Sequence, residues 1–234
     1  MPEILLHGFV LPECPCPTDA PPHERVSSRA ITALSTVAPA DFATYGADDM
    51  AVAVLAHHAL LQAYCLKGPV LPARFGSLFS SRTALATHLE DLATGITQAL
   101  HALSCVEEFT LRLSVAAEVD QPRPQIESGR EYLARGREHR AGRAALTVRR
   151  AALQREISAA LLPRALQVET SPTSRPDRLL DVAILLRKAD VPDLHSMVQR
   201  FGPAAEELHL ELSFSGPWPA YSYRPSIAEL CDGP

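Results

Sequence analysis

The thiol and imidazole side chains near the N-terminus are the first residues whose chemistry could serve a metal site. Cys14, Cys16 and His23 lie within one proline-rich stretch. A single proline separates the two cysteines, which is a poor fit to the Cys-x-x-Cys spacing of structural zinc sites, and no second pair of ligands follows nearby. The spacing therefore predicts no metal site. A redox or metal role for these three residues is the alternative.

Two adjacent histidines, His57 and His58, are the next candidate ligands. They fall in a stretch with helical periodicity, where successive side chains point about 100° apart, so the pair cannot readily chelate one ion. The chain also lacks a glycine-rich phosphate loop and the His-Glu-x-x-His and Gly-x-Ser-x-Gly patterns of hydrolases. These residues and patterns give no positive evidence for catalysis, and we expect no bound cofactor.

Arg74 is a charged residue inside the otherwise apolar segment Val70–Phe75. A charge in such a strand must emerge at the edge of the sheet or be paired with an acid. We favour an ion pair with an acid of the second half of the chain, and a ligand-binding arginine is the alternative.

Basic residues are concentrated in one part of an acidic chain. The net charge is −5, yet residues 120–156 contain 9 arginines and 5 acidic residues. Most arginines of this kind form the solvated face of a helix. Nucleic-acid binding is the alternative, but the remainder of the chain is acidic and no aromatic residues alternate with the arginines, as base stacking would require.

The elements that position these residues can be read from the apolar periodicity of the first half. Two strands, a helix, a strand and a second helix are expected, and the pattern is β-β-α-β-α. The expected ranges are Glu3–Val10, Arg29–Val37, Asp48–Leu66, Val70–Phe75 and Ser81–Leu103.

The second half has the order β-α-β-β-α-β, which is that of a ferredoxin-like domain. We therefore predict an α+β protein of two packed domains, 1–104 and 105–234, the second being ferredoxin-like with a Trp/Pro-rich tail. The expected ranges are Glu108–Ala116, Ser128–Leu162, Ala165–Thr170, Leu179–Arg187, Asp193–Phe201 and Glu207–Ser215.

The chain has no segment that predicts export or insertion into a membrane. Residues 1–10 carry Glu3 and no basic residue, and no stretch approaches the roughly 18 apolar residues of a membrane span. We expect a cytoplasmic protein.

The C-terminal stretch after Ser215 places the single tryptophan, Trp218, between two prolines. Proline fixes its own φ and favours extended geometry in the preceding residue, so the last strand is expected to stop here. Large aromatic side chains are mostly packing residues, and we expect Trp218, Tyr221 and Tyr223 to fold back onto a core. A partner-binding edge is the alternative.

Three segments together are similar to a known family. They are Val70–Phe79, which contains Val-Leu-Pro-Ala-Arg-Phe-Gly, Ser128–Leu133, which reads Ser-Gly-Arg-Glu-Tyr-Leu, and the terminal Gly-Pro-Trp-Pro-Ala-Tyr-Ser-Tyr. In this order and spacing they resemble the gas vesicle protein F/L family over nearly the whole chain. His58 replaces an acidic residue and Tyr223 replaces a phenylalanine of the family pattern.

The resemblance implies an accessory or minor structural protein of gas vesicle formation that is not an enzyme. Its implied partners are the hydrophobic major shell protein and other vesicle proteins, and its implied location is the cytoplasm in association with gas vesicles. The alternative is a ferredoxin-like enzyme or small-molecule-binding protein with a cleft lined by His57, Arg74 or Tyr132. The candidate structural or partner-binding residues are Arg74, Phe75, Gly76, Arg130, Tyr132, Trp218 and Tyr221.

Overall fold

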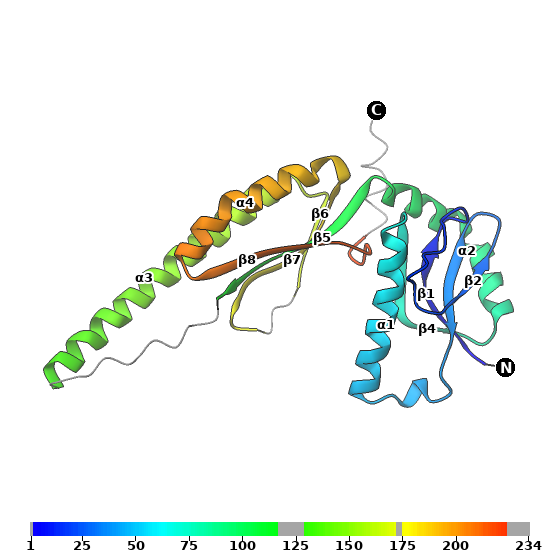
Figure 1. Cartoon of the computed structure of the whole chain (residues 1–234), viewed down its shortest axis with the longest axis horizontal. Coiled ribbons are helices and arrows are strands. Elements are labelled where there is room, and N and C mark those ends of the chain that lie inside the picture. Colours follow the sequence, from blue (N-terminus) through cyan, green and yellow to red (C-terminus); the bar gives the residue numbers. More distant parts are fainter. Residues whose placement is uncertain (1, 117–128, 172–174, 224–234) are drawn as a thin grey trace. The chain divides into compact units, whose positions relative to one another are not determined.

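The computed structural model describes residues 2–116, 129–171 and 175–223 (Figure 1). Packing divides these residues into two compact units. The N-terminal unit contains the residues up to Phe109, Leu185–Lys188 and the described residues from Gly216 onward. The C-terminal unit contains the described residues of Thr110–Ile184 and Ala189–Ser215. Both units combine helices with four-stranded antiparallel sheets, which confirms the predicted α+β class.

The N-terminal unit is built on a sheet with the strand order β2-β3-β1-β4. Its strands are β1 (Ile4–Val10), β2 (Glu24–Ser27), β3 (Thr32–Val37) and β4 (Val70–Phe79), and its helices are η1 (Phe42–Thr44), α1 (Ala47–Cys65) and α2 (Arg82–Leu103).

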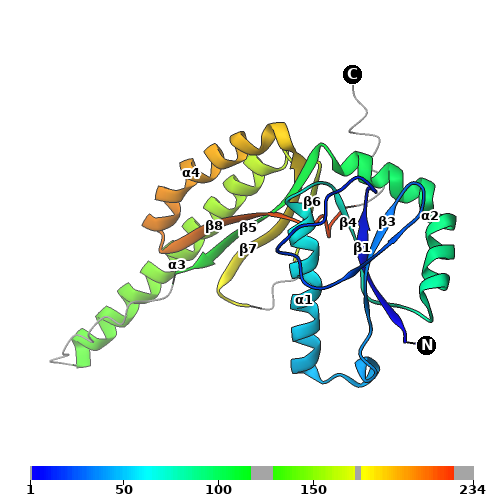
Figure 2. The ribbon, with the colours of Figure 1, turned by 45° about the vertical axis from the view of Figure 1, so that its right-hand side comes forward.

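Helices α1 and α2 cover opposite faces of this sheet (Figure 2). The buried leucines Leu85, Leu89 and Leu100 of α2 form one core with the residues of β1 that face them. Leu61 and Tyr64 of α1 form a second core on the other face. The central strand β1 is consequently buried along its whole length, which explains its nearly continuous apolar sequence.

A bulge in β1 decides which of its side chains face each helix. The register shifts between Leu6 and Gly8 against both neighbouring strands. Leu6 and Phe9 therefore share the core under α2, although strict alternation would place them on opposite faces. The bulge also leaves the side chain of His7 buried.

The strand β2 was not expected from the sequence, and β3 begins later than predicted. The segment Ser28–Ile31 forms the turn between them, in which the Ser28 amide donates to the Ile31 carbonyl over 2.9 Å. Only Val26 of the four residues of β2 is buried. A short edge strand with one apolar residue carries no alternating pattern, so its pairing with β3 had no signal in the sequence.

The C-terminal unit includes a sheet with the order β6-β7-β5-β8, which is the ferredoxin-like arrangement. The chain order β5-α3-β6-β7-α4-β8 confirms the prediction. The bounds are β5 (Val106–Val115), α3 (Gly129–Leu161), β6 (Gln167–Thr170), β7 (Arg178–Arg187), η2 (Lys188–Asp190), α4 (Val191–Glu207) and β8 (Leu210–Trp218).

One buried charge in this unit is fully paired. Asp181 of β7 is 4% exposed and accepts from Arg112 Nε of β5 over 3.2 Å and from Arg178. Two guanidinium groups on one carboxylate offset the cost of removing the charge from water.

The last helix and strand run further than predicted. Helix α4 continues past Phe201 through Pro203, because Leu194, Met197 and Ala205 are buried along one face while Pro203 is exposed. Strand β8 then extends to Trp218, so the expectation that it stops before the prolines was wrong. β8 lies at the edge of its sheet, and an edge strand tolerates proline because its outer side has no hydrogen-bonded neighbour to lose.

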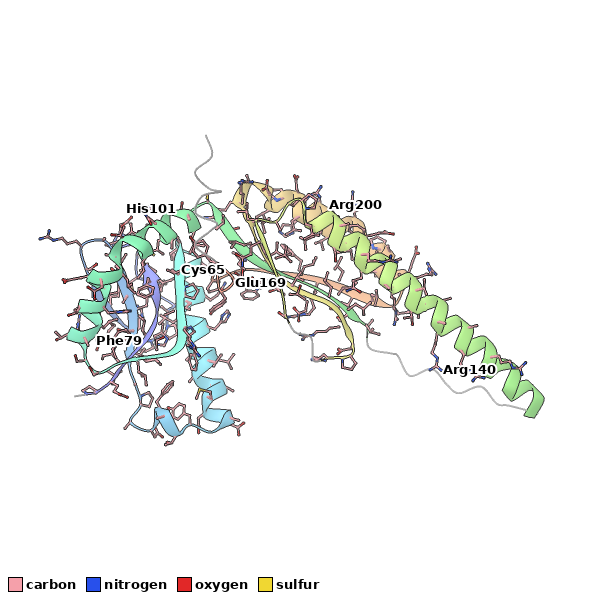
Figure 3. The ribbon with its side chains drawn as sticks, turned by 180° about the vertical axis from the view of Figure 1, so that it is seen from behind. Cys65, Phe79, His101, Arg140, Glu169 and Arg200 are labelled. Atoms are coloured by element: carbon pink, nitrogen blue, oxygen red, sulfur yellow. The ribbon has the colours of Figure 1, made fainter. Side chains whose placement is uncertain are left out.

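Helix α3 is much longer than α4, with 33 residues against 17. Its C-terminal half packs through Leu153, Ile157 and Leu161. Figure 3 shows Arg140 on the other half, beyond the end of the neighbouring helix.

Candidate partner-binding surface of the N-terminal unit

Helix α1 is apolar on all sides, yet only one side of it packs on the sheet. Val52, Val54 and Leu55 on the other side are 67%, 42% and 66% exposed. A helix that is apolar all round normally lies inside a protein. Contiguous exposed apolar side chains of this kind mark surfaces that contact other molecules. We refer to Val52, Val54 and Leu55 as the exposed face of α1.

Two clefts adjoin this face. The first, here the β1-side cleft, measures about 310 Å³ and has Val52 in its wall. The second, here the β4-side cleft, measures about 500 Å³ and has Val54 and Leu55 in its wall. Further lining residues of the β1-side cleft include His7, Thr36, Phe42 and Tyr45, and those of the β4-side cleft are His57, His58, Pro72, Ala73, Arg74, Phe75 and Tyr221.

The predicted Arg-Phe-Gly segment is a bulge in the edge strand β4. Leu6 of β1 pairs with Ser77 and Gly8 pairs with Pro72, so four residues of β4 stand opposite one residue of β1. Gly76 adopts a φ of 84°, which glycine accepts without steric cost. The Ser77 hydroxyl donates to the Arg74 carbonyl over 2.7 Å and closes the bulge.

The bulge sends its two large side chains in different directions. Phe75 lies against the rings of His57 and Phe42, at centroid distances of 5.3 and 6.1 Å. Arg74 is exposed at the β4-side cleft. Within the described residues Arg74 forms no ion pair, and the expected pairing with an acid stays a prediction. In the N-terminal unit the guanidinium is exposed at the edge of the strand.

His57 forms a buried pair with His7, a partner that the sequence did not suggest. The two Nδ1 atoms are 2.9 Å apart, and His7 Nε2 lies 2.9 Å from the Thr36 hydroxyl oxygen. One imidazole must donate and the other accept at the shared contact, so at least the accepting ring must be neutral. Burial first, and then the charge of neighbouring histidines, lowers the pKa of each histidine to about 4.

His58, the next residue, faces the C-terminal segment of the same unit. The ring of Tyr221 stacks on it at 5.9 Å, and Trp218 lies at 5.6 Å. The Tyr221 hydroxyl oxygen is 3.0 Å from His58 Nδ1, and the Gln62 side-chain amide donates to the Pro217 carbonyl over 2.9 Å. The two adjacent histidines therefore hold two different segments against α1.

Glu108 fastens the same C-terminal segment further along. Its Oε2 accepts from the amide of Ser222 over 2.8 Å and from the Ser222 hydroxyl. Burial raises the pKa of this carboxyl, although the hydrogen bonds from Ser222 act in the opposite direction. Trp218 is half-buried and Tyr221 is 48% exposed, so the segment packs on the unit and also contributes to its surface.

The candidate metal ligands of the N-terminal loop do not form a site. Cys16 Sγ lies 3.9 Å from His23 Nε2, which accepts from the Tyr64 hydroxyl over 2.8 Å, while His23 Nδ1 donates to a backbone carbonyl. Cys14 is buried against the core under α1. Across the described residues, no three histidine, cysteine or acidic side chains lie close enough to hold a metal ion.

The arginine-rich helix offers no comparable site in its described part. Arg137, Arg140 and Arg143 are exposed, whereas Arg150 donates to the carbonyls of Leu208 and His209. The side chains of the candidates Arg130 and Tyr132 lie outside the described residues. No helix in the described ranges is long and apolar enough to cross a membrane.

Comparison with known proteins gives two independent results. The family model described as gas vesicle synthesis protein GvpL/GvpF matches residues 19–225. A search of curated proteins found no match.

Two crystal structures share the fold. GvpF from Anabaena sp. PCC7120 superposes with a TM-score of 0.67 at 15% identity, over 95% of both chains. GvpF from Microcystis aeruginosa superposes with a TM-score of 0.62 at 16% identity, over 95% of this chain and 99% of the other. The match of the family model over most of the sequence, together with a shared fold across both units, means that the chain belongs to the GvpL/GvpF family of gas vesicle synthesis proteins.

Proposed function

We propose that this protein acts in gas vesicle formation as an accessory component that binds the hydrophobic major shell protein through the exposed face of α1. Family membership supports the role in gas vesicle formation. The observation that carries the binding proposal is the exposure of Val52 and Leu55, on a helix that is apolar on all sides.

The physical reason for this binding is the low solubility of the shell protein. A strongly hydrophobic subunit aggregates in water unless its apolar surface is covered before it assembles. Contact between that surface and the exposed face of α1 is favourable, because both apolar surfaces are removed from water in the same step. The two adjoining clefts enlarge the apolar area that can make contact.

Binding is tested with the shell protein kept soluble as a fusion and this protein immobilised. Val52→Asp combined with Leu55→Asp is expected to weaken binding at least about tenfold, since buried apolar anchors dominate interface energies. Val148→Asp is the matched control, because Val148 is 66% exposed on helix α3 of the other unit. Normal binding by the double variant, or equal loss in the control, would reject this face as the binding site. Absence of binding by the unaltered protein would reject the proposal as a whole.

The alternative of a small-molecule enzyme has one observation in its favour. His57 and Arg74 line the same cleft, as that reading required. In the part of the chain that the structure describes, the cleft wall contains no carboxylate, serine or cysteine that could act as a nucleophile or acid. His57 is also committed to its contact with His7. The cleft is therefore better suited to hold apolar groups than to transform a substrate.

A further inference from the structure

We infer that the β4-side cleft receives an amphipathic helix of the bound protein partner, and that a carboxylate on this helix pairs with Arg74. The inference rests on the proposed function and adds the form and the charge of the segment that binds. It follows from the shape of the strand edge, the walls of the cleft and the charge at its rim.

The shape of β4 favours a helix over an added strand. β4 is an edge strand, and an edge strand with free backbone groups can accept a strand from another protein. The bulge at residues 73–76 interrupts that row of groups in the middle of the strand. Only short stretches remain on either side of it. A helix needs no continuous backbone ladder and can lie in a groove between α1 and the bulge.

The walls of the cleft fit apolar side chains from one face of such a helix. Val54 and Leu55 form one side and Pro72, Ala73 and Phe75 form the other. Since Val54 and Leu55 also belong to the exposed face of α1, the cleft adjoins that face directly. The Tyr221 ring, held on His58, contributes to the same wall.

The charge at the rim specifies the polar group on the partner. Among the described residues that line the cleft, Arg74 carries a fixed charge and none is acidic. An apolar segment alone would bury part of this guanidinium without a partner, which is costly. A carboxylate satisfies it with two parallel hydrogen bonds.

The surrounding charge favours a protein carboxylate over a phosphate backbone. Residues 1–119, which include most of this unit, contain 6 basic and 12 acidic residues. Binding of nucleic acid depends on several clustered cations and is opposed by a negative surface. One arginine beside an apolar cleft instead matches one acid on an amphipathic helix.

The test measures binding of the soluble shell-protein fusion by Arg74→Glu and Arg74→Gln variants. We expect Arg74→Glu to weaken binding at least about tenfold, since it removes a charge-assisted hydrogen bond and adds repulsion. Arg74→Gln should bind with less salt dependence than the unaltered protein between about 0.05 and 0.5 M salt. Arg29→Glu is the control for charge, because Arg29 is exposed beside the strands at the opposite edge of the sheet.

The outcomes separate this inference from the proposed function. Unchanged binding by Arg74→Glu, while Val52→Asp with Leu55→Asp abolishes binding, overturns the inference and leaves the proposed function standing. Equal loss of binding by Arg74→Glu and Arg29→Glu also overturns it, since net charge alone would then explain the effect. Absence of binding by the unaltered protein rejects both. Equal melting temperatures of the variants establish that the fold is intact, as expected for an exposed side chain.

Discussion

At the scale of single residues, adjacent side chains on α1 perform separate structural tasks. His57 joins the helix to β1 and to the bulge of β4, whereas His58 holds the C-terminal segment. The angular offset between successive helical residues, which disqualifies the pair as a chelate, is what lets them serve two surfaces. The histidines are therefore parts of the packing of the unit.

The buried pair His7 and His57 predicts a loss of stability in mild acid. In the unfolded chain both rings take up protons as the pH falls below about 6.5, whereas in the folded protein they stay neutral until about pH 4. The unfolded state thus binds more protons between these values. The contribution of this pair to the free energy of unfolding should therefore be constant above about pH 6.5 and fall as the pH drops toward 4.

Urea unfolding at several pH values and NMR titration of the histidine ring protons measure this effect. The rings of His7 and His57 should keep the chemical shifts of neutral imidazole to about pH 4. Protonation of either ring near its ordinary pKa would contradict the prediction.

Trp218 is expected to contribute to stability from its half-buried position. Trp218→Ala removes the ring contact with His58 and should lower the free energy of unfolding by about 2 kcal/mol, which is less than the ~3–5 kcal/mol of a fully buried tryptophan. Tyr221→Phe is the milder comparison, since it removes only the hydroxyl that contacts His58. A melting temperature of Trp218→Ala equal to that of the unaltered protein would show that the side chain has no packing role.

At the scale of elements, the bulges of β1 and β4 determine what the N-terminal unit presents at its surface. They lie opposite each other, with His7 between Leu6 and Gly8 facing residues 73–76. The paired irregularity places the half-buried Phe75 beside His57 and leaves the exposed Arg74 at the cleft. A regular antiparallel pairing would set one residue of β4, instead of four, opposite His7.

Two glycines of these bulges should differ in their tolerance of substitution. A Cβ at Gly8 would lie 2.7 Å from the Leu61 side chain and 2.9 Å from the Leu71 carbonyl oxygen, whereas a Cβ at Gly76 meets no atom within 4 Å. Gly76→Ala should cost about 1 kcal/mol through its positive φ, and Gly8→Ala should cost clearly more because backbone must move. Chemical denaturation of both variants tests the order, with Gly46→Ala as a control in open space and at ordinary φ. The reverse order would refute the packing described for β1.

At the scale of the whole molecule, the chain returns to its N-terminal unit at the end. The described residues from Gly216 onward are assigned to that unit, although they begin inside β8, the last strand of the ferredoxin-like order. The Gly-Pro-Trp-Pro stretch is thus used to fasten a distant part of the sequence to α1 and Glu108.

Limited proteolysis tests whether an accessible linker joins domains 1–104 and 105–234, a division that stays a prediction. We expect the junction 104–108 to resist cleavage, because α2 ends at Leu103, β5 begins at Val106, and both Val106 and Glu108 are buried. The proline-rich stretch 15–25 should be cut earlier. Rapid release of two stable fragments cut at 104–108 would contradict this expectation.

The sequence by itself determined the helices, most strands and the ferredoxin-like order, because these depend on periodicity within each segment. The family resemblance likewise rested on short local motifs. The sequence did not determine the strand β2, the continuation of α4 through Pro203, or the extension of β8 to Trp218. In each case packing against distant residues or the position at a sheet edge outweighed the local preference.

The candidate site depended even more on tertiary structure. The Arg-Phe-Gly segment and the terminal tryptophan were recognisable as motifs. That Phe75 packs against His57 and Trp218 against His58 could not be predicted from them. The contact of His7 with His57 joins residues fifty positions apart, and that of His58 with Tyr221 joins residues 163 apart. Separations of this size leave no trace in local periodicity, since only the closed fold brings the partners within bonding distance. The types of the residues were therefore given by the sequence, whereas their partners were decided by the fold.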